Sequence, residues 1–193
     1  MSKYLELVTD GETTTSNKGN PFDHRNFLVS YSIKLNDTIS FYHYLEPWFL
    51  DGFKMMNREK FIFIGFNFKF DLHWYVKTGL ALPNDFRIWD CQIADFILSG
   101  QENRYPSLNE VAAYYGLPSK IDKVKEYWDA GINTPDIPYD ILKEYNDWDV
   151  ELTHLVYKAQ LADPRMTPAM HQLILLSGYD QMVLQEMEMA GIP

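Results

Sequence analysis

Hydrophobic and polar residues alternate over the first part of the chain in the pattern that β-strands require. Residues 26–34 (NFLVSYSIK) and 37–43 (DTISFYH) each alternate with a period of two. Between them, Asn36-Asp37 favours a two-residue turn, so this part of the chain predicts a β-hairpin. Residues 4–9 (YLELVT) predict one further short strand.

The later part of the chain changes to the periodicity of helices. An apolar run at residues 60–66 (KFIFIGF) has strand length and predicts a strand that is covered on both faces. We expect residues 118–138, which Gly131 and Pro135 interrupt, to be irregular. Helical patterns occupy residues 46–56, 68–78, 90–99, 107–115 and 138–162. Strands first, and strand–helix alternation afterwards, predict an α/β fold with a mixed β-sheet flanked by helices.

The C-terminal segment predicts one more long helix, at residues 168–190, with Gly178 as a candidate break. Some of its apolar residues are spaced to form one stripe: Leu173, Leu176, Met182, Val183 and Met187. This stripe would either pack against a further domain or fold back on the rest of the chain. We expect residues 1–165 to form one domain and residues 166–193 to form a helical extension.

Composition narrows the class of protein. With 193 residues, 46% of them hydrophobic, the chain fits one well-packed domain with a short extension. No apolar run approaches the ~20 residues of a membrane span, and the N-terminus lacks a signal-peptide core. The single Cys91 excludes an internal disulfide, and we expect it to be buried and inert in a cytoplasmic protein. A net charge of −10 excludes a broad basic face for duplex binding, but carboxylates that hold divalent cations still allow a nucleic-acid substrate.

Three short patterns place acidic residues where they can share one site. Asp10 and Glu12 follow the first predicted strand, and alternate residues of a strand point to the same face. Asp71 follows the later apolar strand, at the sheet edge where α/β proteins bind ligands. Tyr145 and Asp149 are four residues apart on the long helix, so they share one helix face.

Each pattern alone has a simpler structural explanation. Asp10 and Glu12 fit a solvated turn, and Asp71 fits an acid that stabilises the N-terminus of a helix. A single Tyr-x-x-x-Asp pattern is common in helices. Asp147, inside that last pattern, should point away from the site and toward solvent.

In this order, D-x-E, N-x-x-x-D and Y-x-x-x-D resemble the three exonuclease motifs of the DEDD superfamily, tyrosine variant, which has the ribonuclease H-like fold. The resemblance covers about residues 4–160 and includes the stretches VTDGETT, IGFNFKFDLHWY and SLNEVAAYYG. The histidine variant would carry His at the position of Glu144. Within the superfamily, the chain is most similar to the proofreading domain of family A DNA polymerases, bacterial polymerase I-like and phage. A phrase like LQEMEMAGIP (184–193) opens the polymerase domain in that family.

The resemblance implies a 3′-5′ exonuclease that hydrolyses single-stranded DNA ends with two divalent ions, Mg²⁺ or Mn²⁺. Asp10 would bridge both ions, and Asp71 would support one of them. Glu12 and Asp149 would complete the site that binds the attacking water. Tyr145 would orient that water, because a phenol with an ordinary pKa near ~10 positions better than it accepts protons.

Substrate contacts are expected from four further residues. The resemblance places Asn67 near the terminal nucleotide, and Thr13 directly follows the first motif. Tyr105, in a polar segment, could stack on a base, and Arg104 beside it could meet a phosphate. The implied partners are the 3′ end of single-stranded DNA and a polymerase domain or subunit. Removal of residues 166–193 should then leave the catalytic rate largely intact, and a phage-encoded protein would act in the host cytoplasm.

Other residues near the motifs are expected to be structural. His73 and His154 should lie on helix surfaces or take part in packing, and Lys69 should lie in solvent. Four aromatic side chains are expected in the core: Phe68, Phe70, Trp74 and Trp89.

Two alternative functions stay open. An RNase D-like 3′-5′ exoribonuclease carries the same tyrosine-variant motifs, and only contacts to the 2′-OH separate RNA from DNA at one site. A degenerate, non-catalytic docking module would keep the fold without the chemistry. The complete set of motif residues argues against the docking module, because such a protein would have no need for them.

Overall fold

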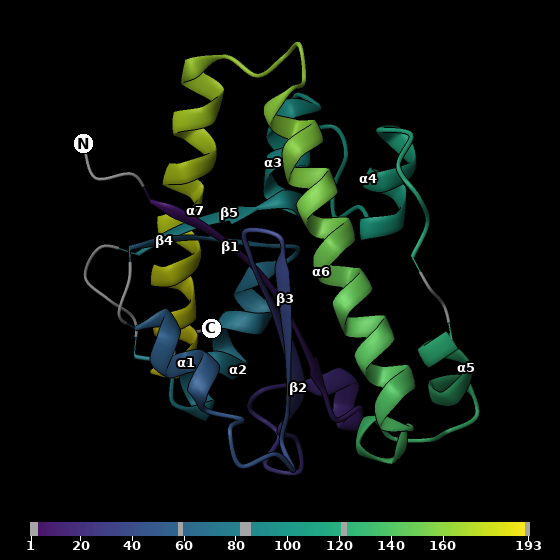
Figure 1. The fold of residues 1–193 in the computed structure, drawn as a ribbon. Helices are drawn as coiled ribbons and strands as arrows, with labels where there is room; N and C mark the ends of the chain where they lie inside the picture. The colour runs from purple at the N-terminus through teal and green to yellow at the C-terminus, as the bar shows by residue number, and fades with distance from the viewer. Residues whose placement is uncertain (1–3, 58–59, 82–85, 121–122, 192–193) are drawn as a thin grey trace.

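The computed structural model describes residues 4–57, 60–81, 86–120 and 123–191, and its described strands form one five-stranded mixed sheet (Figure 1). The strand order is β3-β2-β1-β4-β5. The strands are β1 (Leu5–Thr13), β2 (Leu28–Leu35), β3 (Thr38–His43), β4 (Phe61–Gly65) and β5 (Arg87–Asp90). β1, β2 and β3 pair antiparallel, whereas β1, β4 and β5 pair parallel. The α/β fold with a mixed sheet is therefore confirmed.

Helices cover both faces of this sheet. Their bounds are α1 (Asp51–Met56), α2 (Phe68–Thr78), α3 (Cys91–Leu98), α4 (Leu108–Tyr114), α5 (Lys123–Asp129), α6 (Tyr139–Leu161) and α7 (Pro168–Met189). Two short 3₁₀ turns lie at Ser16–Gly19 and Thr134–Asp136. In Figure 1, α6 (green) lies across one face of the sheet, α2 lies behind the other face, and α7 (yellow) stands at the β4–β5 side.

Alternation along the central strands builds two cores. Leu7 and Phe63 face the core that α2 covers, whereas their neighbours Val8 and Ile64 face the core that α6 covers. Successive side chains of a strand point to opposite faces, so a continuous apolar run fills both cores at once. The buried aromatic residues Phe68, Trp74 and Trp89 confirm the prediction for them, while Phe70 is only partly buried.

Most predicted elements form, with three differences. The hairpin turns at Asn36, whose φ of 55° is tolerated by asparagine, and Leu35 pairs with Thr38. β1 runs on to Thr13, because β2 continues to pair with it beyond residue 9. β5 was not predicted, since its four residues are too few to show a period. α5 forms within residues 118–138, which were expected to be irregular.

Helix α7 is continuous and folds back on the sheet. Gly178 does not break it: a Cβ there would lie 2.5 Å from the carbonyl oxygen of Ile88, so glycine allows α7 to approach β5. The buried face contains Ile174 and Leu175. The predicted stripe is only partly buried: Met182 packs against the core, whereas Leu173 is 44%, Leu176 58% and Val183 55% exposed.

In the part of the chain that the structure describes, no helix is long and apolar enough to cross a membrane. The last two residues of the LQEMEMAGIP phrase, Ile192 and Pro193, lie outside the described residues. The proposed division at residue 165 remains a prediction.

Candidate active site

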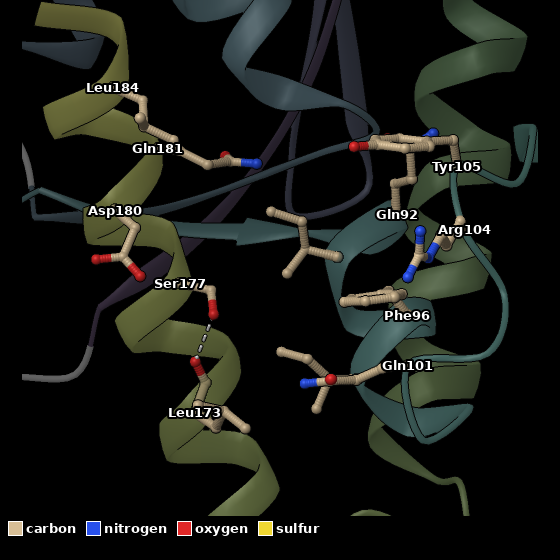
Figure 2. A pocket seen from close by; sticks show the side chains of 12 residues that line it. Gln92, Phe96, Gln101, Arg104, Tyr105, Leu173, Ser177, Asp180, Gln181 and Leu184 are labelled. Carbon is tan, nitrogen blue, oxygen red and sulfur yellow. Dashed lines mark hydrogen bonds between the residues drawn. The ribbon is translucent and has the colours of Figure 1, made fainter. Parts of the chain in front are cut away.

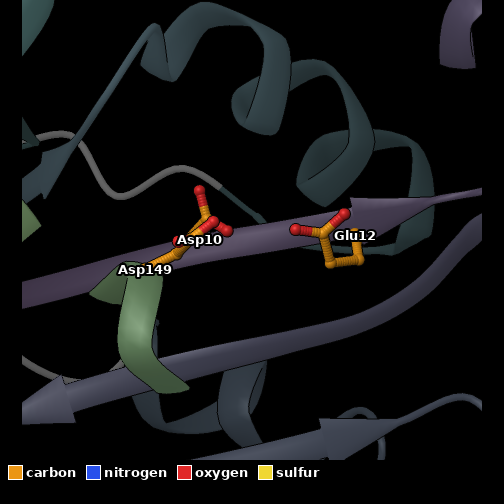
Figure 3. Close-up of side chains that lie close together, drawn as sticks. All are labelled: Asp10, Glu12 and Asp149. Carbon is orange, nitrogen blue, oxygen red and sulfur yellow. The ribbon is translucent and has the colours of Figure 1, made fainter. Parts of the chain in front are cut away.

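Three carboxylates from distant parts of the sequence meet at one point (Figure 3). Asp10 and Glu12 lie on β1, and Asp149 reaches them from α6. One carboxylate oxygen from each residue lies within 4.8 Å of the others. We call Asp10, Glu12 and Asp149 the carboxylate cluster. Their meeting follows from the alternation of β1 and from the packing of α6 across that strand.

Asp71 lies directly beside this cluster. β4 pairs with β1 only as far as Val8, so the backbone of Gly11 extends past the end of β4. The Gly11 N–H donates instead to Asp71 Oδ1 at 3.0 Å, from the first turn of α2. A Cβ at position 11 would lie 3.2 Å from that same oxygen. Glycine between the two acids therefore allows the fourth carboxylate to approach β1.

Asn146 orients Asp10 and was not identified from the sequence. Its side-chain Nδ2 donates to both the carbonyl oxygen and Oδ2 of Asp10, each at 3.1 Å. Its Oδ1 accepts from the hydroxyl of Ser30 at 3.2 Å, and the residue is completely buried. The available signal was its position three residues before Asp149, which places both residues on one helix face.

Lys120 is a second site residue that the sequence did not reveal. Its ammonium forms an ion pair with Oδ2 of Asp149 and lies 4.5 Å from the centre of the Tyr145 ring. A single lysine in a segment expected to be irregular gives no pattern to detect. Only the fold brings it to the cluster.

The carboxylates hold their protons unusually strongly. Burial raises the pKa of Asp10 to about 6 and that of Asp149 to about 7, while the positive charge of Lys120 opposes both rises. Burial, reinforced by the negative charge of Asp10, also raises the pKa of Glu12 and of Asp71 well above their ordinary values. Like charges so close together are stable as anions only when cations join them.

The residues present fit a divalent cation. Asp149 Oδ1 is buried and has no hydrogen-bond partner among the residues that the structure describes. Such an orphaned acceptor is costly unless something else satisfies it. The donors are all carboxylate oxygens, which suit hard ions such as Mg²⁺ and Mn²⁺ better than zinc.

Tyr145 and Thr13 lie close to these acids but in different settings. Tyr145 is buried and packs edge-on against Trp128, with ring centres 5.8 Å apart. A side-chain hydrogen bond from Tyr145 opposes the rise in the pKa of Asp149. Thr13 is also buried, and its hydroxyl donates to the carbonyl oxygen of Thr14 at 3.2 Å. The structure therefore directs that hydroxyl at the backbone.

Asn67 occupies an exposed, left-handed turn at the start of α2, with φ of 55°. Asp90, which was not identified from the sequence, accepts from the backbone N–H groups of Asn67 and Phe68 at 3.1 and 2.8 Å. The side chain of Gln181 on α7 donates to the same carboxylate at 2.6 Å. Helix α7 is thus linked to the turn that carries Asn67.

Arg104 and Tyr105 line a separate cavity of about 520 Å³ between α3 and α7 (Figure 2). Both residues are exposed, and Tyr105 is 87% exposed. Phe96 and Leu184 contribute apolar walls. Gln181 also lines the cavity, and its buried Oε1 has no hydrogen-bond partner among the described residues.

Of three neighbours of the motifs, two differ from expectation. Lys69 is not solvated but pairs with Glu188 of α7 at 2.6 Å, because α7 folds back on α2. His73 is buried and contacts the same carboxylate at 2.6 Å, which agrees with a packing role. Asp147 does not point into solvent: it accepts from the hydroxyl of Ser32 on β2 and pairs with Lys143.

Sequence comparison matches residues 7–161 to a protein family described as 3′-5′ exonuclease. No curated protein sequence matches the chain.

Solved structures with the same fold are distant in sequence. NrnC from Brucella melitensis, bound to pGG, superposes with a TM-score of 0.68 at 17% identity, covering 98% of this chain and 87% of that chain. RNase D from Escherichia coli, an exoribonuclease involved in structured RNA processing, gives 0.60 at 16% identity, over 94% and 45%. The POL domain of Pol1 from M. smegmatis, in complex with DNA primer-template and dNTP, gives 0.54 at 10% identity, over 84% and 24%. At these identities the likeness shows the fold alone.

Proposed function

Because this chain belongs to the 3′-5′ exonuclease family of the DEDD type, we propose that it removes nucleotides from the 3′ ends of single-stranded DNA. The observation that carries the proposal is the meeting of Asp10, Glu12 and Asp149, with Asp71 beside them. These residues come from three separate parts of the chain, and only the fold unites them.

The proposed cofactors are two divalent ions, Mg²⁺ or Mn²⁺, held by the cluster and Asp71. Bound there, the ions would acidify a water molecule and offset the charge that develops on the phosphate. Asn146 would keep Asp10 in place through its two hydrogen bonds. Tyr145, which lies against Asp149, would orient the attacking water with its hydroxyl.

The cavity between α3 and α7 is the proposed place for a base of the same strand. Tyr105 offers an exposed ring for stacking, and Arg104 offers a cation for a phosphate. The unpartnered Oε1 of Gln181 would accept a hydrogen bond from an amino group on the base. Gln181 in this cavity donates to Asp90, and Asp90 accepts from the backbone N–H of Asn67 in the turn at the start of α2.

A role in proofreading, beside a polymerase domain or subunit, is part of the proposal. Support comes from the similarity of the motifs to family A polymerases and from the exposed apolar side of α7. Large apolar groups such as Leu176 and Val183, more than half exposed, are suited to contact another protein surface. The second candidate function is an exoribonuclease, since RNase D shares the fold.

The test compares DNA and RNA oligomers of the same sequence, labelled at the 5′ end, with Mg²⁺ or Mn²⁺ present. We expect the DNA to shorten one nucleotide at a time from the 3′ end, and a 3′-blocked copy to resist. Faster digestion of the RNA would favour the exoribonuclease. Digestion of neither polymer, by a folded protein that binds no metal, would favour the docking module.

A further inference from the structure

The ammonium group of Lys120 lies where the acids of the cluster converge. It pairs with Asp149, whose side chain is only 2% exposed, while the lysine side chain is 23% exposed. Asp10 and Glu12 also attract this ammonium electrostatically. Lys120 is therefore a partly exposed cation beside a group of carboxylates that attract it.

This ion pair leaves Asp149 incompletely satisfied. Lys120 engages Oδ2, whereas Oδ1 is buried and has no hydrogen-bond partner within the described residues. A buried carboxylate is stable only when its charge is paired and its oxygens are bonded. The contact with Lys120 thus reduces the repulsion in the cluster without completing the shell of Asp149.

Two hydrogen bonds hold the backbone of Ser119 and Lys120, and the Lys120 side chain is partly exposed to solvent. The Lys120 N–H donates to Asn109 Oδ1 at 2.6 Å, and the Ser119 carbonyl accepts from the indole of Trp148 at 3.0 Å. The side chain beyond this anchor is a flexible four-carbon stem that ends in a strongly hydrated point charge. Rotation about the bonds of such a stem is enough to move an ammonium from a carboxylate into solvent.

We propose that Lys120 is an exchangeable counter-ion of the carboxylate cluster, which holds Asp149 in the metal-free protein and releases it when a divalent ion binds. The proposal rests on the proposed function, because it requires the cluster to hold metal. Two cations within a few ångströms repel each other strongly in a partly buried site. Lys120 therefore competes with the metal for Asp149, and it is a positioning residue that acts through that carboxylate.

Lys120→Met tests the proposal, because methionine keeps an unbranched stem and removes the charge. Calorimetry measures Mn²⁺ binding to the free protein without nucleic acid, and circular dichroism checks the fold. We expect Lys120→Met to bind Mn²⁺ at least about tenfold more tightly than the unsubstituted protein. An arginine guanidinium can donate two parallel hydrogen bonds to one carboxylate. The Lys120→Arg variant should therefore bind Mn²⁺ no more tightly than the unsubstituted protein.

Lys143→Met is the matched control, since Lys143 pairs with Asp147 on the same helix but outside the cluster. Its Mn²⁺ affinity should not change. In EDTA, the Lys120→Met variant should also melt at a lower temperature than the unsubstituted protein. If Lys120 were merely structural, the substitution would lower the melting temperature without any gain in Mn²⁺ affinity.

A folded Lys120→Met variant with unchanged or weaker Mn²⁺ affinity overturns the proposal and leaves the proposed function standing. If neither the unsubstituted protein nor the variant binds Mn²⁺, the metal-dependent function fails as well. Should the methionine variant not fold, Lys120→Gln gives the same comparison.

Discussion

Replacing Asp149 by asparagine should stabilise the metal-free protein above neutral pH. Asparagine keeps the shape of the side chain and removes its charge. The Asp149 side chain is 2% exposed, and burial raises its pKa from 3.8 to about 7 against the opposing charge of Lys120. Because the pKa is raised in the folded state, the wild-type acid supports folding fully below pH ~4. That contribution is lost as the pH rises through about 7.

The size of the effect follows from the same pKa. A rise from 3.8 to about 7 corresponds to about 4 kcal/mol at ~1.36 kcal/mol per pH unit, as an upper limit. Loss of the ion pair with Lys120 offsets part of this gain. For a chain of this length, 1 kcal/mol moves the melting temperature by roughly 2–4 °C, so we expect a rise of several degrees at pH 8.

Thermal unfolding in EDTA, followed by circular dichroism at pH 4 and pH 8, measures this effect. The Asp149→Asn variant should melt several degrees above wild type at pH 8 and within about a degree of it at pH 4. Asp147→Asn is the control on the same helix, and it should not raise the melting temperature, because Asp147 is bonded to Ser32 and Lys143. An equal difference at both pH values, or a fall at pH 8, would refute the reasoning.

Three further substitutions test other parts of the account. Tyr145→Phe should slow single-turnover hydrolysis by about 10–10³-fold, the range for one positioning hydrogen bond, and an unchanged rate would remove the role given to its hydroxyl. Gly178→Ala should lower the melting temperature, because the new Cβ would lie 2.5 Å from the Ile88 carbonyl oxygen; a rise would contradict the contact between α7 and β5. Asn146→Leu should lower the free energy of unfolding, measured with urea, by about 1–3 kcal/mol, because groups of Asp10 and Ser30 would lose their hydrogen-bond partner. An unchanged urea midpoint would show that these hydrogen bonds contribute nothing to stability.

The sequence predicted the elements that depend on local periodicity. The hairpin at residues 28–43 follows from alternation and from a turn that asparagine favours. Helix α6 and the strand β4 follow from their long, regular patterns. Periodicity placed Asp10 with Glu12 on one strand face and Asp149 on one face of the long helix, whereas the resemblance to the exonuclease motifs implied that these acids meet.

Features that depend on contacts between distant segments could not be predicted. Hydrogen bonds from Lys120 to Asn109 and from Trp148 to Ser119 place Lys120 beside Asp149, and no spacing in the sequence predicts these contacts. β5 has four residues, fewer than a period needs.

The buried side of helix α7 could not be predicted either, because apolar residues occur around much of its circumference. Ile174 and Leu175 face the sheet, while Leu176 does not, and the close approach of Gly178 to β5 decides which side is buried. The expectation that removal of residues 166–193 leaves the catalytic rate largely intact stays a prediction, but this packing shows that the segment contributes to the fold. Their loss would uncover β5 and take away the bond from Gln181 to Asp90.

The central claim is that the carboxylate cluster and Asp71 form a metal-dependent exonuclease site. Single-turnover digestion of a 5′-labelled single strand in Mg²⁺ tests it most directly, with wild type compared with Asp10→Asn and Asp149→Asn. Wild type should produce a ladder from the 3′ end that EDTA abolishes, and both folded variants should produce none. Digestion by either variant at the wild-type rate would contradict the claim.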